Sequence, residues 1–166
     1  MRIKDDPHLQ QKPKPLTLQG TDKVQKAIDV MCDNKIGSII ITDKNDKVTG
    51  ILTERDMLNR VLKPKVDVKK TAISKVMTRD VRVANENDDL ANWMQAMSEE
   101  RFRRLPIVDE DGRLVNVMSQ GDFVAHTFPD VYEKIRQDLK SHIGRHLQLA
   151  LIVLGVLVLG MIALNY

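Results

Sequence analysis

Two stretches of equal length decide the fold: VQKAIDVMCDNKIGSIIITDKNDKVTGILTERD at residues 24–56 and LANWMQAMSEERFRRLPIVDEDGRLVNVMSQGD at residues 90–122. They align without a gap, from Val24 with Leu90 to Asp56 with Asp122. Few positions are identical, but the order of apolar, polar and turn residues is kept. Both stretches end in a hydroxyl residue followed three positions later by an aspartate. The chain is therefore predicted to contain one supersecondary unit twice.

Each copy carries the pattern of a strand, a helix, two strands and a second helix. Short strands are predicted at Thr17–Leu18 and Val81–Val83. A helix with apolar residues every three to four positions follows each of them, and Asp22 and Asp88 are predicted to cap these helices. A second helix is expected to begin at Thr53 in the first copy and at Ser119 in the second. Branched apolar runs predict the paired strands between the helices, which are Ser38–Thr42 with Val48–Leu52 and Leu105–Val108 with Leu114–Met118.

These elements predict an α/β (α+β) fold of two β-α-β-β-α repeats packed with pseudo-twofold symmetry. The segment at 1–15 carries three prolines among charged side chains and is expected to form a flexible leader. The predicted boundaries are a leader at 1–15, a first repeat at 16–62, a linker at 63–75, a second repeat at 76–128, a juxtamembrane helix at 129–146 and a transmembrane helix at 147–166.

The C-terminal stretch LQLALIVLGVLVLGMIALNY at 147–166 carries no charge, whereas every charged side chain lies at or before Arg145. As a helix, this stretch would be about 30 Å long, which matches the hydrocarbon thickness of a bilayer. A helix buried in a soluble core is the alternative, but it would have to be apolar on every face. Basic residues precede the stretch and none follow it. We therefore expect a single-pass C-terminal anchor in the lipid bilayer, with the soluble part in the cytoplasm.

Charge and short motifs exclude several classes of function. The chain has 26 Lys+Arg against 23 Asp+Glu, without a basic stripe, so no nucleic-acid partner is expected. The lone Cys32 cannot form an intrachain disulfide. The sequence contains no P-loop, no H-E-x-x-H, no C-x-x-C and no G-x-S-x-G. We therefore predict a protein that is not an enzyme, with neither catalytic residues nor a metal site.

The repeat resembles the tandem pair of CBS domains that is also called a Bateman module. The resemblance covers about residues 16–128, in the usual order and spacing of that family. It departs from the family at Asn116, where Gly is usual, and at Val83, where Thr or Ser is common and the first copy has Thr17. The segments that carry the resemblance are Ile36-Gly37-Ser38, GILTERD at 50–56, MTRDV at 77–81 and RFRRLPIVD at 101–109.

The resemblance implies an adenosine nucleotide, AMP, ADP or ATP, held in a cleft between the two copies. The residues themselves are compatible with this, because a hydroxyl at a strand-to-helix junction suits a phosphate and the aspartate that follows suits ribose hydroxyls. Guanidinium groups suit phosphate as well. The candidate ligand residues are Thr17, Ile36, Thr53, Asp56, Phe102, Arg103, Arg104, Ser119 and Asp122.

Each candidate has a structural alternative. Thr or Ser followed three residues later by an acid is also an ordinary capping box. Glu99 and Glu100 could neutralise the two arginines, and Ile36 and Phe102 could be core residues. At the level of function, the alternative is a ligand-free dimerisation scaffold tethered to the membrane. The resemblance also implies a homodimer through the CBS modules, and a sensor of this kind needs a membrane or cytoplasmic protein partner that the sequence does not name.

Overall fold

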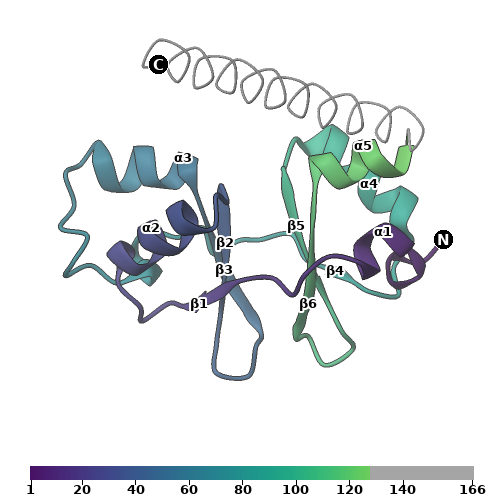
Figure 1. The fold of residues 1–166 in the computed structure, drawn as a ribbon, viewed down its shortest axis with the longest axis horizontal. Coiled ribbons are helices and arrows are strands. Elements are labelled where there is room, and N and C mark those ends of the chain that lie inside the picture. Colours follow the sequence, from purple (N-terminus) through teal and green to yellow (C-terminus); the bar gives the residue numbers. More distant parts are fainter. Residues whose placement is uncertain (128–166) are drawn as a thin grey trace, which may run out of the picture. The chain divides into compact units, whose positions relative to one another are not determined.

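The computed structural model describes residues 1–127, which contain the two predicted repeats (Figure 1). In the first repeat, β1 (Thr17–Gln19) is parallel to β2 (Ser38–Thr42), and β2 is antiparallel to β3 (Val48–Thr53). Helix α2 (Val24–Asp33) joins β1 to β2. Helix α3 (Glu54–Asp56) follows β3 and continues as the π-helical segment η2 (Met57–Leu62).

The second repeat has the same order and the same pairing. Strand β4 (Ala84–Asn85) is parallel to β5 (Arg104–Val108), which is antiparallel to β6 (Leu114–Ser119). Helix α4 (Leu90–Glu100) joins β4 to β5, and α5 (Gln120–Thr127) follows β6. A 3-10 turn, η3 (Ile73–Lys75), lies in the connection between the repeats. The predicted fold of two β-α-β-β-α repeats is therefore confirmed.

Two local predictions are wrong. The fourth strand is Ala84–Asn85 rather than Val81–Val83. Asp22 and Asp88 do not cap the helices, because their carboxylates accept hydrogen bonds from the backbone N–H of Gln19 (2.9 Å) and of Asn85 (2.8 Å) in the preceding turns. The cap of α4 is Asp89, and the cap position of α2 makes no side-chain hydrogen bond.

The two repeats contact each other through equivalent positions. Ile40, Ile51 and Leu114 form a small apolar cluster that joins the two sheets. Ser38 and Arg104, which are equivalent in the repeat, are hydrogen-bonded to each other at 3.1 Å. Lys47 and Arg113, also equivalent, form an isolated β-bridge. Contacts between equivalent residues place the pseudo-twofold axis through these pairs, as the sequence repeat predicts.

The segment at 1–15 differs from the expected flexible leader. It contains the 3-10 turn η1 (Ile3–Asp5) and the short helix α1 (Pro7–Gln10). Ile3 and Leu9 are 2% and 3% exposed and belong to the core of the second repeat. The backbone N–H of Ile3 donates to the carbonyl of Asp88 at 3.0 Å. These contacts order the segment despite its prolines and charges. We refer to residues 1–15 as the N-terminal strap.

No helix in the part of the chain that the structure describes is long and apolar enough to cross a membrane. The predicted juxtamembrane helix at 129–146 and the predicted span at 147–166 lie outside the described residues.

Candidate functional site

Two cavities of about 280 Å³ each lie where the repeats meet. They share Gly37, Ser38 and Arg104, so the hydrogen-bonded Ser38–Arg104 pair stands between them. The first, here called the arginine cavity, is lined by Gly37, Ser38, Thr53, Glu54, Arg55, Arg101, Phe102, Arg103 and Arg104. The second, the strap cavity, is lined by Lys12, Pro13, Pro15, Leu16, Lys35, Ile36, Gly37, Ser38, Ile40, Arg104, Asn116, Val117 and Ser119.

The arginine cavity collects four guanidinium groups, and Glu54 supplies the one carboxylate among its described lining residues. Arg55 comes from the first repeat, Arg101 and Arg103 come from the segment between α4 and β5 of the second, and Arg104 is the first residue of β5. Within the described residues, Arg55, Arg101 and Arg103 make no ion pair. Four guanidinium groups beside one carboxylate leave an excess of positive charge that attracts an anion, and guanidinium groups bind phosphate through paired N–H donors.

The acids that were expected as alternative partners of these arginines are engaged elsewhere. Glu100 forms an ion pair with Arg82 at 2.7 Å, and Glu99 accepts a hydrogen bond from Gln95. Neither acid lines the arginine cavity. The guanidinium groups in this cavity are therefore not neutralised by those two acids.

Backbone conformation supplies one basic residue to each cavity. Lys35 and Arg101 are equivalent in the repeat, and both adopt the left-handed conformation just after a helix, with φ of 52° and 58°. A side chain in this region costs about 1 kcal/mol relative to glycine. Lys35 lines the strap cavity and Arg101 lines the arginine cavity. The same strained turn therefore places a positive charge at each cavity.

The pair Thr53–Asp56 forms a complete capping box at the start of α3. Oδ2 of Asp56 accepts from the backbone N–H of Thr53 at 3.0 Å and from its hydroxyl at 2.6 Å. Thr53 thus gives its only hydroxyl proton to Asp56 and has none left for a phosphate. Oδ1 of Asp56 has longer contacts, at 3.3 Å to the Thr78 hydroxyl and 3.5 Å to the Arg60 guanidinium.

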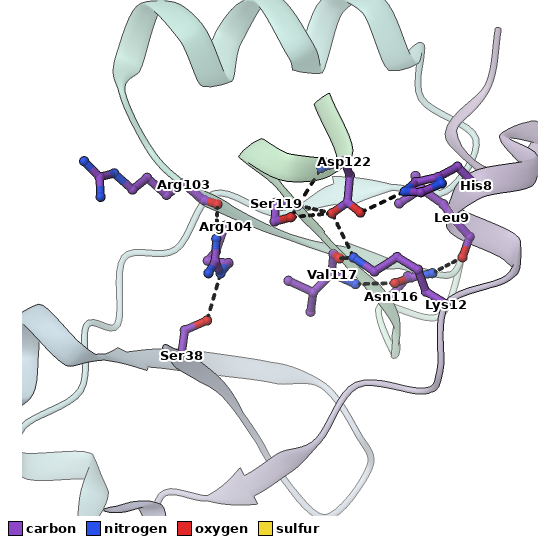
Figure 2. Close-up of polar contacts among 10 residues, drawn as sticks. All are labelled: His8, Leu9, Lys12, Ser38, Arg103, Arg104, Asn116, Val117, Ser119 and Asp122. Atoms are coloured by element: carbon purple, nitrogen blue, oxygen red, sulfur yellow. Dashed lines mark hydrogen bonds and ion pairs between the residues drawn. The ribbon is translucent and has the colours of Figure 1, made fainter. Parts of the chain in front are cut away.

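The pair Ser119–Asp122 makes the same hydrogen bonds, and its carboxylate has an ammonium as an additional donor (Figure 2). Oδ2 of Asp122 accepts from the backbone N–H and the hydroxyl of Ser119, each at 2.6 Å. Nζ of Lys12 donates to the same oxygen at 2.8 Å, and Oδ1 faces His8 at 3.5 Å. Burial raises the pKa of Asp122, but the hydrogen bonds from Lys12 and Ser119 outweigh it and hold the pKa below the usual carboxyl value. Asp122 is therefore held as a carboxylate paired with an ammonium.

The structure brings six of the nine predicted ligand residues to a cavity and leaves three outside the linings. Thr53, Phe102 and Arg103 line the arginine cavity, Ile36 and Ser119 line the strap cavity, and Arg104 lines both. Phe102 and Ile36 also pack on the cores of their repeats, as the structural alternative expected, and their contact with a ligand stays a prediction. The three outside the linings are Thr17, which pairs with β2, and the buried Asp56 and Asp122.

Sequence reasoning missed Lys12, Lys35, Arg55 and Arg101 at the cavities. The alignment of the two copies could have found Lys35 and Arg101, because it pairs two basic residues at one helix end. Arg55 stands inside the T-E-R-D motif itself. Lys12 carries no local signal, since it lies in a segment that was expected to be flexible.

A family model described as CBS domain matches residues 11–63 and 73–127, which include both repeats and both cavities. The chain belongs to the CBS-domain family. Within this family, it is similar to a CBS domain-containing protein of Arabidopsis thaliana, with 30% identity over 105 residues. That match covers 63% of this chain but 19% of the plant protein, so the chain spans about a fifth of that relative's length.

Solved CBS structures share the fold of this chain. A CBS-domain protein of Burkholderia ambifaria is 30% identical with a TM-score of 0.64, and the match covers 77% of this chain and 91% of that one. The CBS domain pair of protein MJ0100 is 25% identical with a TM-score of 0.63, and the match covers 78% of this chain and 96% of that one. That pair was solved with 5′-methylthioadenosine and S-adenosyl-L-methionine bound.

Proposed function

We propose that this CBS pair is a regulatory module that senses an adenosine nucleotide in the cleft between its repeats and signals the change to a protein partner. The observation that carries the proposal is the arginine cavity, where four guanidinium groups meet and none of them has an ion-pair partner among the described residues. The adenosine ligands of the MJ0100 pair support the choice of an adenosine compound.

The charge of the cavity favours phosphorylated ligands over the sulfonium compound seen with MJ0100. Four guanidinium groups beside the carboxylate of Glu54 attract an anion in proportion to its charge. We therefore expect affinity to fall in the order ATP, ADP, AMP, with S-adenosylmethionine weakest because its sulfonium is cationic. In this arrangement, the phosphates lie in the arginine cavity and the ribose lies toward Oδ1 of Asp56.

A ligand in this cavity would act on the arrangement of the two repeats. Thr53 and Arg55 belong to the first repeat, whereas Arg101, Phe102 and Arg103 belong to the second. A nucleotide that contacts both shifts the equilibrium between two arrangements by the difference of its affinities for them. This supplies the coupling that a sensor needs.

Membrane tethering is part of the proposal. It is supported by the uncharged sequence at 147–166 and by the basic residues before it. A tether at the cytoplasmic face would raise the effective concentration of the module near a membrane partner. Flotation with phosphatidylcholine vesicles tests this, because the full chain should float and a chain ending at residue 146 should not.

The test of the sensor is calorimetric titration of the full chain, purified in mild detergent, with ATP, ADP, AMP and S-adenosylmethionine. Arg103→Ala should weaken ATP binding at least tenfold, which is about 1.4 kcal/mol. Arg113→Ala is the matched control, because Arg113 pairs with Asp111 and lines neither cavity. Absence of binding by all four compounds, or S-adenosylmethionine binding more tightly than ATP, would contradict the proposal.

A ligand-free scaffold is the second candidate, and one observation favours it. Leu58 and Leu62 on η2 are 59% and 65% exposed, beside an apolar cavity of about 830 Å³ on the first repeat. An exposed apolar surface of this kind suits a second copy of the chain. If no nucleotide binds but Leu58→Asp converts a dimer to a monomer in light scattering, the scaffold is the better description.

A further inference from the structure

The N-terminal strap places one side chain at the aspartate of the second repeat. Nζ of Lys12 donates to Oδ2 of Asp122 at 2.8 Å and to the carbonyl oxygen of Val117 at 2.7 Å (Figure 2). The Lys12 side chain is 28% exposed and that of Asp122 is 10% exposed, so the pair is largely shielded from water. Shielding strengthens a charge-assisted hydrogen bond.

We infer that Lys12 determines which half of the cleft accepts a nucleotide: its ammonium is a tethered substitute for a ribose at Asp122, and the second half-site opens only when it leaves. This inference rests on the proposed function. The first half-site is defined here by Asp56 and the carbonyl of Ile51, and the second by Asp122 and the carbonyl of Val117. Lys12 lies outside both β-α-β-β-α units and gives these two half-sites different roles.

The Lys12 ammonium can take the place of a ribose because both carry hydrogen-bond donors that fit the same acceptors. A ribose offers two neighbouring hydroxyl groups, each of which can donate to a carboxylate or a carbonyl oxygen. A lysine ammonium carries three N–H donors, and two of them are used by Asp122 and Val117. While Lys12 holds Oδ2 of Asp122 and the carbonyl of Val117, only Oδ1 of Asp122, which faces His8 at 3.5 Å, is left for a ribose, so the two neighbouring hydroxyls cannot both find an acceptor.

Among the described residues, the contacts to the aspartate of the first half-site, Asp56, are weaker than those to Asp122. Oδ1 of Asp56 is contacted by the Thr78 hydroxyl at 3.3 Å and by the Arg60 guanidinium at 3.5 Å, which are both long. The carbonyl of Ile51, equivalent to that of Val117, accepts from the backbone N–H of Thr78 instead of from an ammonium. A ribose hydroxyl can therefore reach Asp56 by displacing a weak contact rather than a short ion pair.

The strap stays in place without the ammonium. Ile3 and Leu9 are buried in the core of the second repeat, and the amide of Asn116 donates to the carbonyl of Leu9 at 2.7 Å. The backbone N–H of Lys4 donates to the carbonyl of Glu86 at 2.9 Å. Because these contacts anchor the strap upstream of Lys12, only the flexible Lys12 side chain has to move.

The experiment counts ATP bound per chain by calorimetry on the full chain in detergent, comparing wild type with Lys12→Met. Methionine keeps the stem of the side chain and removes the charge. The wild type should bind one ATP with high affinity, and the variant should bind two, with affinity at the new site raised at least tenfold. Adding Asp122→Asn to Lys12→Met should remove the new site and leave the first.

The control is Lys14→Met, which makes the same charge change in the strap at an exposed residue that lines neither cavity. It should bind one ATP, like the wild type. If Lys12→Met binds only the same single ATP, Lys12 does not close the second half-site and the inference is overturned. If Lys12→Met binds ATP more weakly at the second half-site, Lys12 is a phosphate ligand, which also overturns it.

The outcomes separate this inference from the proposed function. One ATP in wild type and one in Lys12→Met would leave the sensor standing without the role of Lys12. No ATP in wild type and one in Lys12→Met, lost with Asp122→Asn, would support the role of Lys12 and contradict binding at the arginine cavity. No ATP in either protein would overturn both.

Discussion

The two repeats differ in the residue that donates a hydrogen bond to their equivalent aspartates. Thr78 and Lys12 each donate to the aspartate of one repeat, Asp56 in the first and Asp122 in the second. In the first repeat the donor is a hydroxyl 3.3 Å from Oδ1 of Asp56, and in the second it is an ammonium 2.8 Å from Oδ2 of Asp122. The comparison shows that the strap is the second repeat's counterpart of the segment between the repeats. A symmetric fold thus surrounds its two equivalent aspartates with different donors.

The two covering segments are held in different ways. The segment at Thr78 pairs with β3 through its backbone, since Ile51 and Thr78 exchange N–H···O bonds of 2.8 and 2.9 Å. This close approach requires Gly50, where an added Cβ would lie 2.7 Å from Met77 Sδ and 2.9 Å from the carbonyl oxygen of Thr78. The second repeat has Asn116 at this place, and its side chain binds the strap instead. The departure from the family's usual glycine thus has a structural reason.

The largest expected effect comes from giving the first repeat the second repeat's residue. Gly50→Asn should lower the free energy of unfolding by about 1 to 3 kcal/mol, because the Thr78 carbonyl is fixed by its hydrogen bond and cannot yield. Urea unfolding followed by circular dichroism measures this. Gly121→Ala is the control, since its Cβ would lie 3.6 Å from the nearest atom, Ser119 Oγ, and should cost nothing. Equal stability of Gly50→Asn and wild type would contradict the tight approach.

The second prediction concerns the pH dependence of the stability that the Lys12–Asp122 pair gives to the second repeat. The lowered pKa of Asp122 means that its pairing with Lys12 stabilises the fold above the ordinary carboxyl pKa of about 3.9 and that this contribution is lost as the pH falls through the lower pKa in the folded state. The measurement is the difference in free energy of unfolding between wild type and Lys12→Met. It should stay at about 1 to 2 kcal/mol from pH 7 to about pH 5 and shrink below about pH 4.

Taking the difference removes the contributions of Asp5, Asp22 and Asp89, whose pKa values are also lowered but whose contacts do not involve Lys12. A difference that is unchanged at pH 3 would mean that the ion pair does not contribute to stability.

Much of the fold could be predicted because the repeat records it twice. The run of branched residues at Ser38–Thr42 was predicted with the bounds that the structure has, and the other three strands of the antiparallel pairs differ from the prediction by one residue at an end. The caps could not be predicted, because Asp88 and Asp89 are adjacent and only the turn geometry decides which one meets the helix. The left-handed turn at Arg101 was also not predicted, since arginine gives no local signal for positive φ.

The cavities were predicted in part, through the resemblance to CBS domains. The resemblance implied that Phe102, Arg103 and Arg104 lie at the cleft, and all three line the arginine cavity. The ordered conformation of the strap could not be predicted, because amino-acid composition reports only the local conformational preference of a segment. Its order depends on Ile3 and Leu9 packing into the core of the second repeat, which begins far along the sequence at Ala84. The contact of Lys12 with Asp122 is a consequence of that long-range packing.

The smallest expected effect tests the weaker of the two contacts. Thr78→Val removes the hydroxyl that approaches Asp56 at 3.3 Å and keeps the size of the side chain and the backbone pairing with Ile51. A long neutral-donor contact of this kind is worth about 0.5 kcal/mol, so the loss of stability in urea should be well below that of Lys12→Met. Affinity for ATP at the first half-site should change less than about threefold, because Oδ1 of Asp56 is already accessible to a stronger donor.

The matched control is Thr49→Val, which removes another hydroxyl of the same repeat, bonded to the Ile41 carbonyl at 3.1 Å and distant in sequence from Thr78. The two variants should lose similar stability, and neither should gain a second ATP. If Thr78→Val instead costs as much as Lys12→Met, or raises ATP affinity tenfold, then Asp56 is held as firmly as Asp122. The two half-sites would then be closed to the same degree, and the difference between a hydroxyl and an ammonium at this position would not decide where the ligand binds.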